Sequence, residues 1–257
     1  MTSMTSRRIG ARGPLVSPIG FGAFKIGRNE GIKYERGYDL PSERAAIDLV
    51  RAVCESGVTL LDTAPAYGLS EERVGLAIAG LRSPVVLSTK VGETFEAGRS
   101  HFDFSLAGIE SSIARSLGRL GVARIDLLFL HSDGNDLAIL DDGEATRVMR
   151  KLRERGTIGL MGFSGKSVEG HRQAIREGFD VLMVEYHPLD VSQRPALEEA
   201  AARGVGVLVK KPLAAGRLAP ADAIPFALAA PAVASAVIGS LSAANIAECV
   251  RVASTNC

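Results

Sequence analysis

Four polar residues, each at or just after the end of a short apolar run, have side chains that together suit proton transfer. They are Asp62, Tyr67, Lys90 and His131. A tyrosine hydroxyl has a pKa of about 10 and is a weak acid near neutrality, but an adjacent ammonium favours the phenolate and makes the hydroxyl a better proton donor. A carboxylate beside the lysine keeps it charged, and a histidine can orient a carbonyl oxygen. The set predicts proton donation to an oxygen while another group delivers hydride.

Each of these side chains also has a purely structural interpretation when it is taken alone. The aspartate could cap a loop, the tyrosine could be packing, the lysine could be a charge partner and the histidine could lie in the core. We favour the functional interpretation because all four lie at or just after the ends of three successive predicted strands, and active sites of parallel α/β barrels are built at the carboxyl ends of strands.

A metal-dependent hydrolase is a competing interpretation of the strand ends. Its ligands would be Asp62, His131, Glu185 and His187, whose types suit zinc. This set leaves the lysine and tyrosine without a task, and His187 precedes Pro188, which can turn it off the axis of the strand. We therefore predict no metal site.

The elements that must position these residues alternate along the chain. Eight apolar runs have the nearly continuous hydrophobic character of parallel strands buried on both faces: Pro18–Ala23, Val58–Asp62, Val85–Lys90, Ile125–His131, Ile158–Ser164, Val181–Tyr186, Val205–Lys210 and Ser235–Gly239. Amphipathic patterns between them predict helices over Ser42–Ser56, Ser70–Ala79, Leu106–Leu120, Glu144–Arg155, Val168–Glu177, Pro195–Arg203 and Ala243–Val252. Several of these helices stop at a glycine, and Ser42 and Ser70 are suitable N-cap residues.

This alternation predicts an α/β protein with a (β/α)8 TIM barrel fold, formed by a single domain over residues 1–257. A doubly wound fold needs a glycine-rich turn that opens a helix after the first strand, and Gly20–Gly22 is not followed by a helix. The segment before Pro18 is expected to form a hairpin that plugs the barrel. Prolines between residues 214 and 234 are expected to confine any helix there to Ile224–Ala229.

Composition and charge exclude several classes of protein. The chain has 257 residues, 46% of them hydrophobic and 23% charged, with a net charge of +1 and no Trp. No run of Lys and Arg is interleaved with aromatic residues, so we expect no nucleic-acid partner. No apolar run approaches the roughly 20 residues that span a bilayer, so we expect no membrane partner.

The cysteines and the N-terminus indicate a cytoplasmic protein. Cys54, Cys249 and Cys257 are odd in number and have no metal-ligand spacing, which favours a reducing compartment. The two arginines near the N-terminus are not followed by an apolar segment, as a secretory signal would require. We expect a monomer or a small homo-oligomer.

Over essentially its whole length the chain resembles the aldo-keto reductase family. The resemblance rests on GFGAFKIG after the first strand, LLDTAPAYGLSEERVG across the second, LSTKVG at the third, IDLLFLHS at the fourth, GFSG at the fifth, VEYHP at the sixth, KKPLAAG at the seventh and IGS at the eighth. It implies that the family's catalytic tetrad falls on Asp62, Tyr67, Lys90 and His131. The family uses NADPH, less often NADH, which lies extended across the top of the barrel.

The resemblance also implies a set of cofactor-binding residues at the strand ends. Carried over by position, they are Gly22, Ala23, Phe24, Asp62, Ser164, Met183, Lys210, Lys211, Pro212, Leu213, Gly216, Ile238, Gly239, Ser240, Asn245 and Glu248.

The cofactor half departs from the family pattern. Relatives often hold the nicotinamide with Ser-Asn after strand five, Gln on strand six and a stacking Tyr after strand seven, where this chain has Ser164-Gly165, Met183 and Lys210. Lys210 cannot stack on the ring and would repel the positive charge of the oxidised cofactor. No basic residue stands after Ser240 at the positions that commonly bind a 2′-phosphate. We expect NADP(H) on the strength of the family, with NAD(H) as the alternative.

The resulting expectation is an NAD(P)-dependent oxidoreductase that reduces aldehydes or ketones to alcohols, or runs in reverse, with a small-molecule carbonyl or alcohol as substrate. A sugar or polyol dehydrogenase is the near alternative. A cofactor-binding sensor or regulatory subunit with low turnover is the alternative from another class, because the altered nicotinamide contacts leave room for it.

Overall fold

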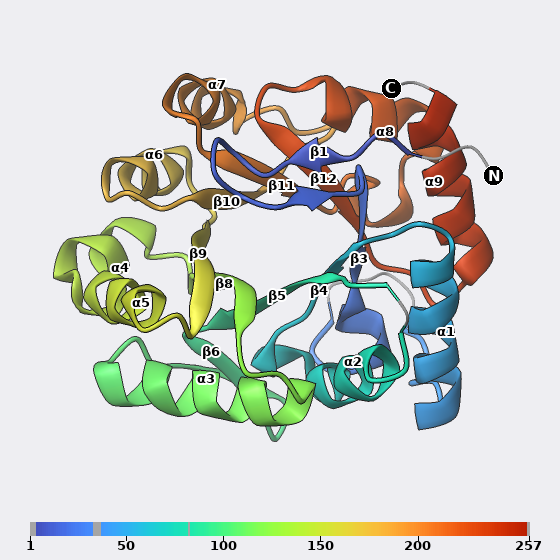
Figure 1. The fold of residues 1–257 in the computed structure, drawn as a ribbon. Coiled ribbons are helices and arrows are strands. Elements are labelled where there is room, and N and C mark those ends of the chain that lie inside the picture. The colour runs from blue at the N-terminus through green and yellow to red at the C-terminus, as the bar shows by residue number, and fades with distance from the viewer. Residues whose placement is uncertain (1–3, 33–36, 82, 256–257) are drawn as a thin grey trace.

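The computed structural model describes residues 4–32, 37–81 and 83–255, and its centre is a closed barrel of parallel strands (Figure 1). The eight strands, in the order in which they pair around the barrel, are β3 (Ile19–Gly22), β4 (Leu60–Asp62), β5 (Val86–Val91), β8 (Ile125–His131), β9 (Ile158–Ser164), β10 (Val181–Glu185), β11 (Gly206–Lys210) and β12 (Val233–Ile238). β12 pairs with β3 and closes the ring. The predicted (β/α)8 barrel is confirmed, and every predicted strand is present within two residues at either end.

Helices surround the barrel, which Figure 1 views along its axis. They are α1 (Glu43–Glu55), α2 (Ser70–Ile78), α3 (Leu106–Leu120), α4 (Asp136–Asp142), α5 (Glu144–Glu154), α6 (Val168–Arg176), α7 (Arg194–Arg203), α8 (Pro220–Ala229) and α9 (Ala243–Thr255), with 3-10 turns η1 (Ala23–Ile26), η2 (Pro65–Tyr67) and η3 (Ala214–Gly216). In the described part of the chain, every helix is too short or too polar to span a bilayer.

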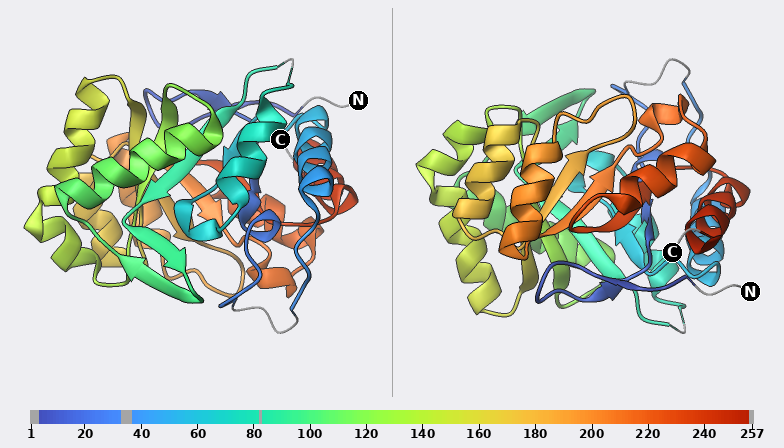
Figure 2. Two further views of the ribbon diagram at one scale, coloured as in Figure 1. Left: turned by 90° about the horizontal axis from the view of Figure 1, so that it is seen from below. Right: turned by 90° about the horizontal axis from the view of Figure 1, so that it is seen from above.

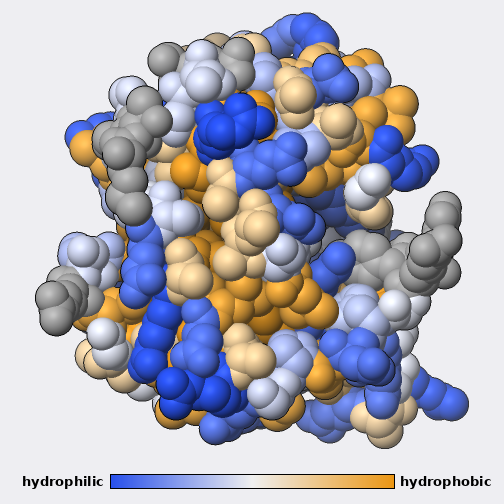
Figure 3. Space-filling view, turned by 90° about the vertical axis from the view of Figure 1, so that its right-hand side faces the viewer, coloured by the Kyte–Doolittle hydropathy of each residue, from blue (hydrophilic) through white to orange (hydrophobic). Residues whose placement is uncertain are grey.

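The helix α1 illustrates how the sequence produces this layer. Its buried residues, Ala46, Leu49, Val50 and Val53, recur at the spacing of one helical face. The hydroxyl of Ser42 accepts a hydrogen bond from the backbone N–H of Ala45 and caps the helix, as predicted. The space-filling view of the side that carries α1 and α9 shows polar residues around a hydrophobic area in the middle of this face (Figure 3).

Two predictions about helix ends are wrong. Ser70 does not cap α2, because its hydroxyl is buried and donates to the carbonyl of Ala23 while also contacting the hydroxyl of Thr63. The helix α8 is longer than Ile224–Ala229 and begins at Pro220. Proline is well suited to the first position of a helix, and Pro225 costs one backbone hydrogen bond that the burial of the helix's apolar face offsets.

Two hairpins that do not belong to the barrel lie at its opposite ends (Figure 2). The first, β1 (Arg7–Arg8) and β2 (Leu15–Val16), brings Ile9 and Val16 against the barrel interior and confirms the predicted plug. The second, β6 (Glu93–Glu96) and β7 (Arg99–Phe102), follows β5 and was not predicted. Its turn uses positive φ at Ala97 and Gly98, and alanine gives no signal for such a turn.

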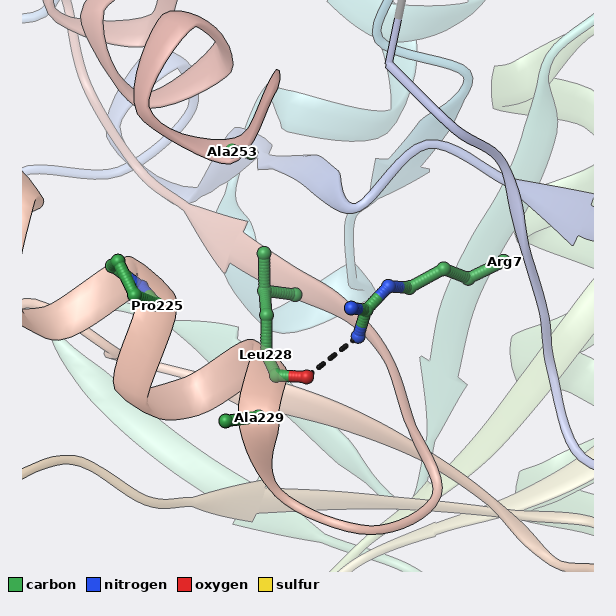
Figure 4. A pocket seen from close by; sticks show the side chains of 5 residues that line it. All are labelled: Arg7, Pro225, Leu228, Ala229 and Ala253. Atoms are coloured by element: carbon green, nitrogen blue, oxygen red, sulfur yellow. Dashed lines mark hydrogen bonds between the residues drawn. The ribbon is translucent and has the colours of Figure 1, made fainter. Parts of the chain in front are cut away.

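The hairpin plug is tied to the rest of the barrel through Arg7. Its guanidinium donates to the carbonyl oxygens of Leu228, at 2.7 Å, and Val233, at 3.1 Å. Figure 4 shows this side chain directed at the carbonyl oxygen of Leu228. Arg7 also lines a small pocket of about 70 Å³ together with Pro225, Leu228, Ala229 and Ala253. The contacts make Arg7 a structural residue that holds the plug on α8 and β12.

Substitution of Arg7 should therefore destabilise the fold. We expect Arg7→Ala to lower the free energy of unfolding by about 2 kcal/mol, because two partly buried carbonyl groups lose a charged donor. Urea denaturation followed by circular dichroism measures this change. Arg12→Ala, on the exposed tip of the same hairpin, is the matched control and should change the free energy by less than about 0.5 kcal/mol. Equal effects of the two substitutions would contradict the structural role of Arg7.

Candidate active site

A buried ion pair between Lys90 and Asp62 forms the base of the site. Lys90, near the carboxyl end of β5, is only 1% exposed, and Asp62 is the last residue of the neighbouring strand β4. The ammonium lies 2.7 Å from both carboxylate oxygens and donates to the carbonyl of Thr63 at 2.9 Å. Ser88 donates to the same carboxylate at 2.7 Å. Burial works against the charge of Lys90, yet Asp62 and Tyr67 outweigh burial and raise the pKa of the lysine.

Tyr67 lies directly beside this pair at the end of η2. The Lys90 ammonium is 4.8 Å from the centre of its ring, and Phe24 packs edge-on against that ring at 5.0 Å between centroids. Burial raises the pKa of the phenol and outweighs Lys90, which lowers it. Lys90 thus lowers the pKa of Tyr67 as predicted, but burial has the larger effect and the net shift of that pKa is upward. The phenol remains protonated at neutral pH and is available as an acid.

His131 completes the group at the end of β8, and it meets a carboxylate that the sequence did not single out. Its Nδ1 lies 2.8 Å from Oε2 of Glu93, on the hairpin strand β6. Burial lowers the pKa of His131, whereas Glu93 raises it. Burial favours a protonated Glu93, but His131, Ser100 and Arg28 together lower its pKa to about 2. Glu93 was missed because nothing in the pattern around it predicts that the chain after β5 folds back over the barrel.

Lys210, at the end of β11, contacts the end of β9, the next strand but one around the barrel. Its ammonium donates to the hydroxyl of Ser164 at 3.2 Å and to the carbonyl of Gly165 at 3.1 Å. Burial is the main cause that lowers the pKa of Lys210 to about 8, and the neighbouring Lys211 and Lys90 lower it further. The site therefore contains an amine that titrates close to neutral pH.

The absence of a side chain at Gly165 has a packing reason. A Cβ atom there would lie 2.5 Å from the ring of Phe163 and 3.0 Å from both Oδ2 of Asp136 and Nε2 of His171. Asp136 is itself occupied, because it accepts hydrogen bonds from the backbone of Lys166 and from Ser167. An asparagine at this position would require its neighbours to move.

Comparisons with known proteins agree with this geometry. The family model described as "Aldo/keto reductase family" matches residues 18–225. A crystal structure assigned as an aldo-keto reductase from Pseudomonas aeruginosa superposes with a TM-score of 0.89 at 41% identity and covers 98% of this chain and 94% of its own. L-galactose dehydrogenase from Arabidopsis thaliana is 30% identical over 85% of this chain and 68% of its own length. An NADH-specific methylglyoxal reductase from Escherichia coli is 29% identical over 79% of this chain and 65% of its length.

The chain belongs to the aldo/keto reductase family. It is accordingly an oxidoreductase that acts on carbonyl or alcohol groups with a nicotinamide cofactor. The geometry brings the four residues predicted as the tetrad to the carboxyl ends of three neighbouring strands, β4, β5 and β8.

Several of the residues predicted to bind the cofactor lie along the rest of the same barrel rim. β9, β10, β11, β12 and β3 are consecutive neighbours, and their ends carry Ser164, Lys210 and the Ile238–Ser240 turn. Gly22 and Gly239 approach closely, since a Cβ on Gly239 would lie 3.4 Å from the carbonyl of Gly22. This arc of small and polar residues fits an extended dinucleotide.

The loop after β11 is the part of the arc best suited to phosphate groups. Lys211, Ala214, Ala215 and Gly216 have positive φ, and Lys211 pairs with Glu185 at 2.5 Å. Arg217, which the sequence reasoning passed over, is exposed and donates to the carbonyl of Ala214 at 3.0 Å. Arg217 directly follows the KKPLAAG motif, and this position in the sequence could have indicated it as a candidate phosphate ligand. Pro212 is buried and Leu213 half-buried, so these two residues shape the loop.

The remaining predicted contacts differ in how accessible they are. Met183 is 2% exposed in the core of the barrel, and Ala23 is completely buried. The hydroxyl of Ser240 accepts a hydrogen bond from the backbone of Ser242 at the start of α9. Asn245 and Glu248 are exposed one turn apart on α9. Their binding roles remain predictions.

The alternative metal site does not assemble. Both oxygens of Asp62 are held by Lys90, and Glu185 is paired with Lys211. Within residues 4–32, 37–81 and 83–255, no three histidine, cysteine or acidic side chains lie together in a way that could hold a metal ion. This arrangement favours the proton-transfer interpretation of the strand ends.

The charge of Lys210 should control the binding of oxidised cofactor. Below pH 8 the ammonium repels the positive nicotinamide, so affinity for NADP+ should rise as the pH passes above the pKa of about 8. Lys210→Met should raise that affinity about ten-fold at neutral pH and abolish its pH dependence, while affinity for the reduced cofactor changes little. Isothermal titration calorimetry at about pH 6.5 and about pH 9.5 measures both constants. Lys151→Met, on the exposed surface of α5, is the control. Unchanged NADP+ affinity in Lys210→Met would refute the repulsion.

Proposed function

We propose that this chain interconverts aldehydes or ketones and alcohols, with Tyr67 as the proton donor to the carbonyl oxygen. The observation that carries the proposal is the position of Tyr67 against the buried Lys90–Asp62 pair. The residues fit a nicotinamide cofactor, which when bound supplies or accepts the hydride. The side chains of the protein itself transfer the proton and orient the substrate.

The proposed roles follow from burial and charge. Asp62 keeps Lys90 protonated in a place that water does not reach. The fixed ammonium stabilises negative charge as it develops on the Tyr67 oxygen, so the phenol can release its proton although burial raises its pKa. His131, beside the same mouth of the barrel, orients the oxygen of the substrate. In the oxidative direction the phenolate takes the proton back.

We propose NADP(H) as the cofactor, with NAD(H) as the alternative. Arg217 supplies positive charge to the phosphate part of the arc, next to Leu213 and Gly216, and Lys211 adds an ammonium that is paired with Glu185. The adenosine end offers hydroxyl and amide groups at Ser240 and Asn245 and no base. The identity to the NADH-specific reductase supports the alternative. Binding constants for both reduced cofactors decide between them.

A sugar or polyol dehydrogenase is a second candidate, supported by the identity to L-galactose dehydrogenase. A sensor with low turnover is a third, supported by Lys210 in place of a stacking aromatic side chain. An intact tetrad, tight cofactor binding and no turnover on a broad panel of carbonyls and sugars would favour the sensor.

We further propose a cytoplasmic protein that works as a monomer or small homo-oligomer, without nucleic-acid or membrane partners. One observation supports the reducing compartment: Cys54 and Cys249 are free. Burial raises the pKa of each thiol to about 11, so both stay protonated at neutral pH. Cys257 lies outside the described residues.

Replacement of the Tyr67 hydroxyl tests the proposed proton donor. Tyr67→Phe should lower kcat/KM for carbonyl reduction by about 100-fold or more, because general-acid catalysis contributes a factor of this order. Cofactor binding should be retained. Tyr186→Phe is the matched control, since that ring is buried against Phe226 rather than beside Lys90, and its activity should match the wild type. Undiminished activity in Tyr67→Phe would show that another group supplies the proton.

A further inference from the structure

The contact between Glu93 and His131 is not explained by the tetrad. Glu93 comes from the hairpin strand β6, and its Oε2 lies 2.8 Å from Nδ1 of His131, with exposed side-chain fractions of 12% and 19%. Nδ1 has no contact with solvent, and its angle to the carboxylate departs from that of an ideal hydrogen bond. One ring nitrogen of the histidine is thus enclosed against an acid, and the other is left for the substrate.

The carboxylate is itself held in place from two sides. The Ser100 hydroxyl, on the second strand of the hairpin, donates to Oε1 of Glu93 at 2.6 Å. Arg28 contributes a positive charge, and its guanidinium lies 3.2 Å from the centre of the Phe95 ring on the same strand. Arg28 also donates to the carbonyl of Ala66, the residue before Tyr67, at 3.0 Å. The hairpin is therefore anchored to the turn that carries the proposed proton donor.

The charges around the ring determine where its proton lies. Glu93 faces His131 from β6, whereas Lys90 from β5 and Lys210 from β11 oppose a positive charge on it. Burial lowers the pKa of the imidazole, and the contacts of Glu93 keep its own pKa at about 2. A neutral imidazole has one proton, and a carboxylate can only accept hydrogen bonds. The proton therefore belongs on Nδ1, and Nε2 carries a lone pair.

We propose that Glu93 is a positioning residue that holds His131 in the tautomer protonated at Nδ1, so that Nε2 accepts a hydrogen bond from a hydroxyl group of the substrate. Resting on the proposed function, this assigns an alcohol or a cyclic hemiacetal as the substrate that binds to the neutral imidazole; its oxidation further requires the Tyr67 phenolate, which takes the hydroxyl proton. A carbonyl oxygen offers no proton to Nε2. Its binding to His131 requires the imidazolium, whose charge Glu93 offsets.

The tautomer can be read directly, without substrate or cofactor. In the protein labelled with 15N, two-bond correlation spectra at pH 7 should give His131 a protonated Nδ1 and an unprotonated Nε2, with the signals assigned by comparison with His131→Gln. In Glu93→Gln the amide can donate to Nδ1, so Nε2 should gain the proton, and the pKa of His131 should fall by about one unit. Glu96→Gln, on the exposed side of the same strand, should leave both signals unchanged.

Kinetics provide the second measurement. Glu93→Gln should lower kcat/KM for oxidation of a sugar or aliphatic alcohol about ten-fold at neutral pH and lower kcat/KM for aldehyde reduction less, while Glu96→Gln changes neither. A wild-type His131 protonated at Nε2, or an unchanged tautomer in Glu93→Gln, would overturn the proposal. If Glu93→Gln does not fold, the wild-type spectrum alone still tests the proposal, because it shows which nitrogen of His131 carries the proton. A protein with the Nδ1–H tautomer but no activity on any alcohol or carbonyl would instead refute the proposed function.

Discussion

The candidate active site depends on one interaction, the ion pair of Lys90 and Asp62 inside the rim of the barrel. A charged lysine that is 1% exposed is stable only if a partner and further acceptors replace water. Both carboxylate oxygens and the carbonyl of Thr63 take that place. The pair is also a constraint on position, because removal of either partner leaves a buried charge. Tyr67 is set against this fixed charge.

Burial shifts the pKa values of Tyr67 and His131, the groups around the pair, in opposite directions, and this difference gives them different roles. It raises the pKa of the Tyr67 phenol and lowers that of the His131 imidazole, so both are neutral in the resting site. The ammonium of Lys90 and the carboxylate of Glu93 then act on them as fixed charges of opposite sign. One neutral group is prepared to release a proton and the other to accept a hydrogen bond. Lys210 adds a third charge where the nicotinamide is expected.

The sequence predicted the elements whose signals are local. β8 and β9 begin and end where the apolar runs do. The glycines that follow four of the predicted helices all have positive φ: Gly57, Gly156, Gly178 and Gly204. The errors arise where a tertiary contact overrides the local preference. Ser70 turns inward to the carbonyl of Ala23 rather than capping its helix, and burial lets α8 continue through Pro225. The β6–β7 hairpin was not predicted because only one of its two turn residues, Gly98, is of a type that is typical of positive φ, whereas the other is Ala97.

The sequence by itself determined the barrel, the strand ends that carry the four residues of the proposed tetrad, and the departures from the family pattern in the cofactor half, because residue types at the ends of periodic apolar runs are local properties. Only the tertiary structure decided how these groups are charged and which ones share a partner. Glu93 is distant from His131 in sequence and 2.8 Å from it in space, and the ammonium of Lys210 meets Ser164 past the end of the intervening strand β10. Such pairings depend on strand order and on the burial of each group, and the pKa shifts that follow exist only in the closed barrel.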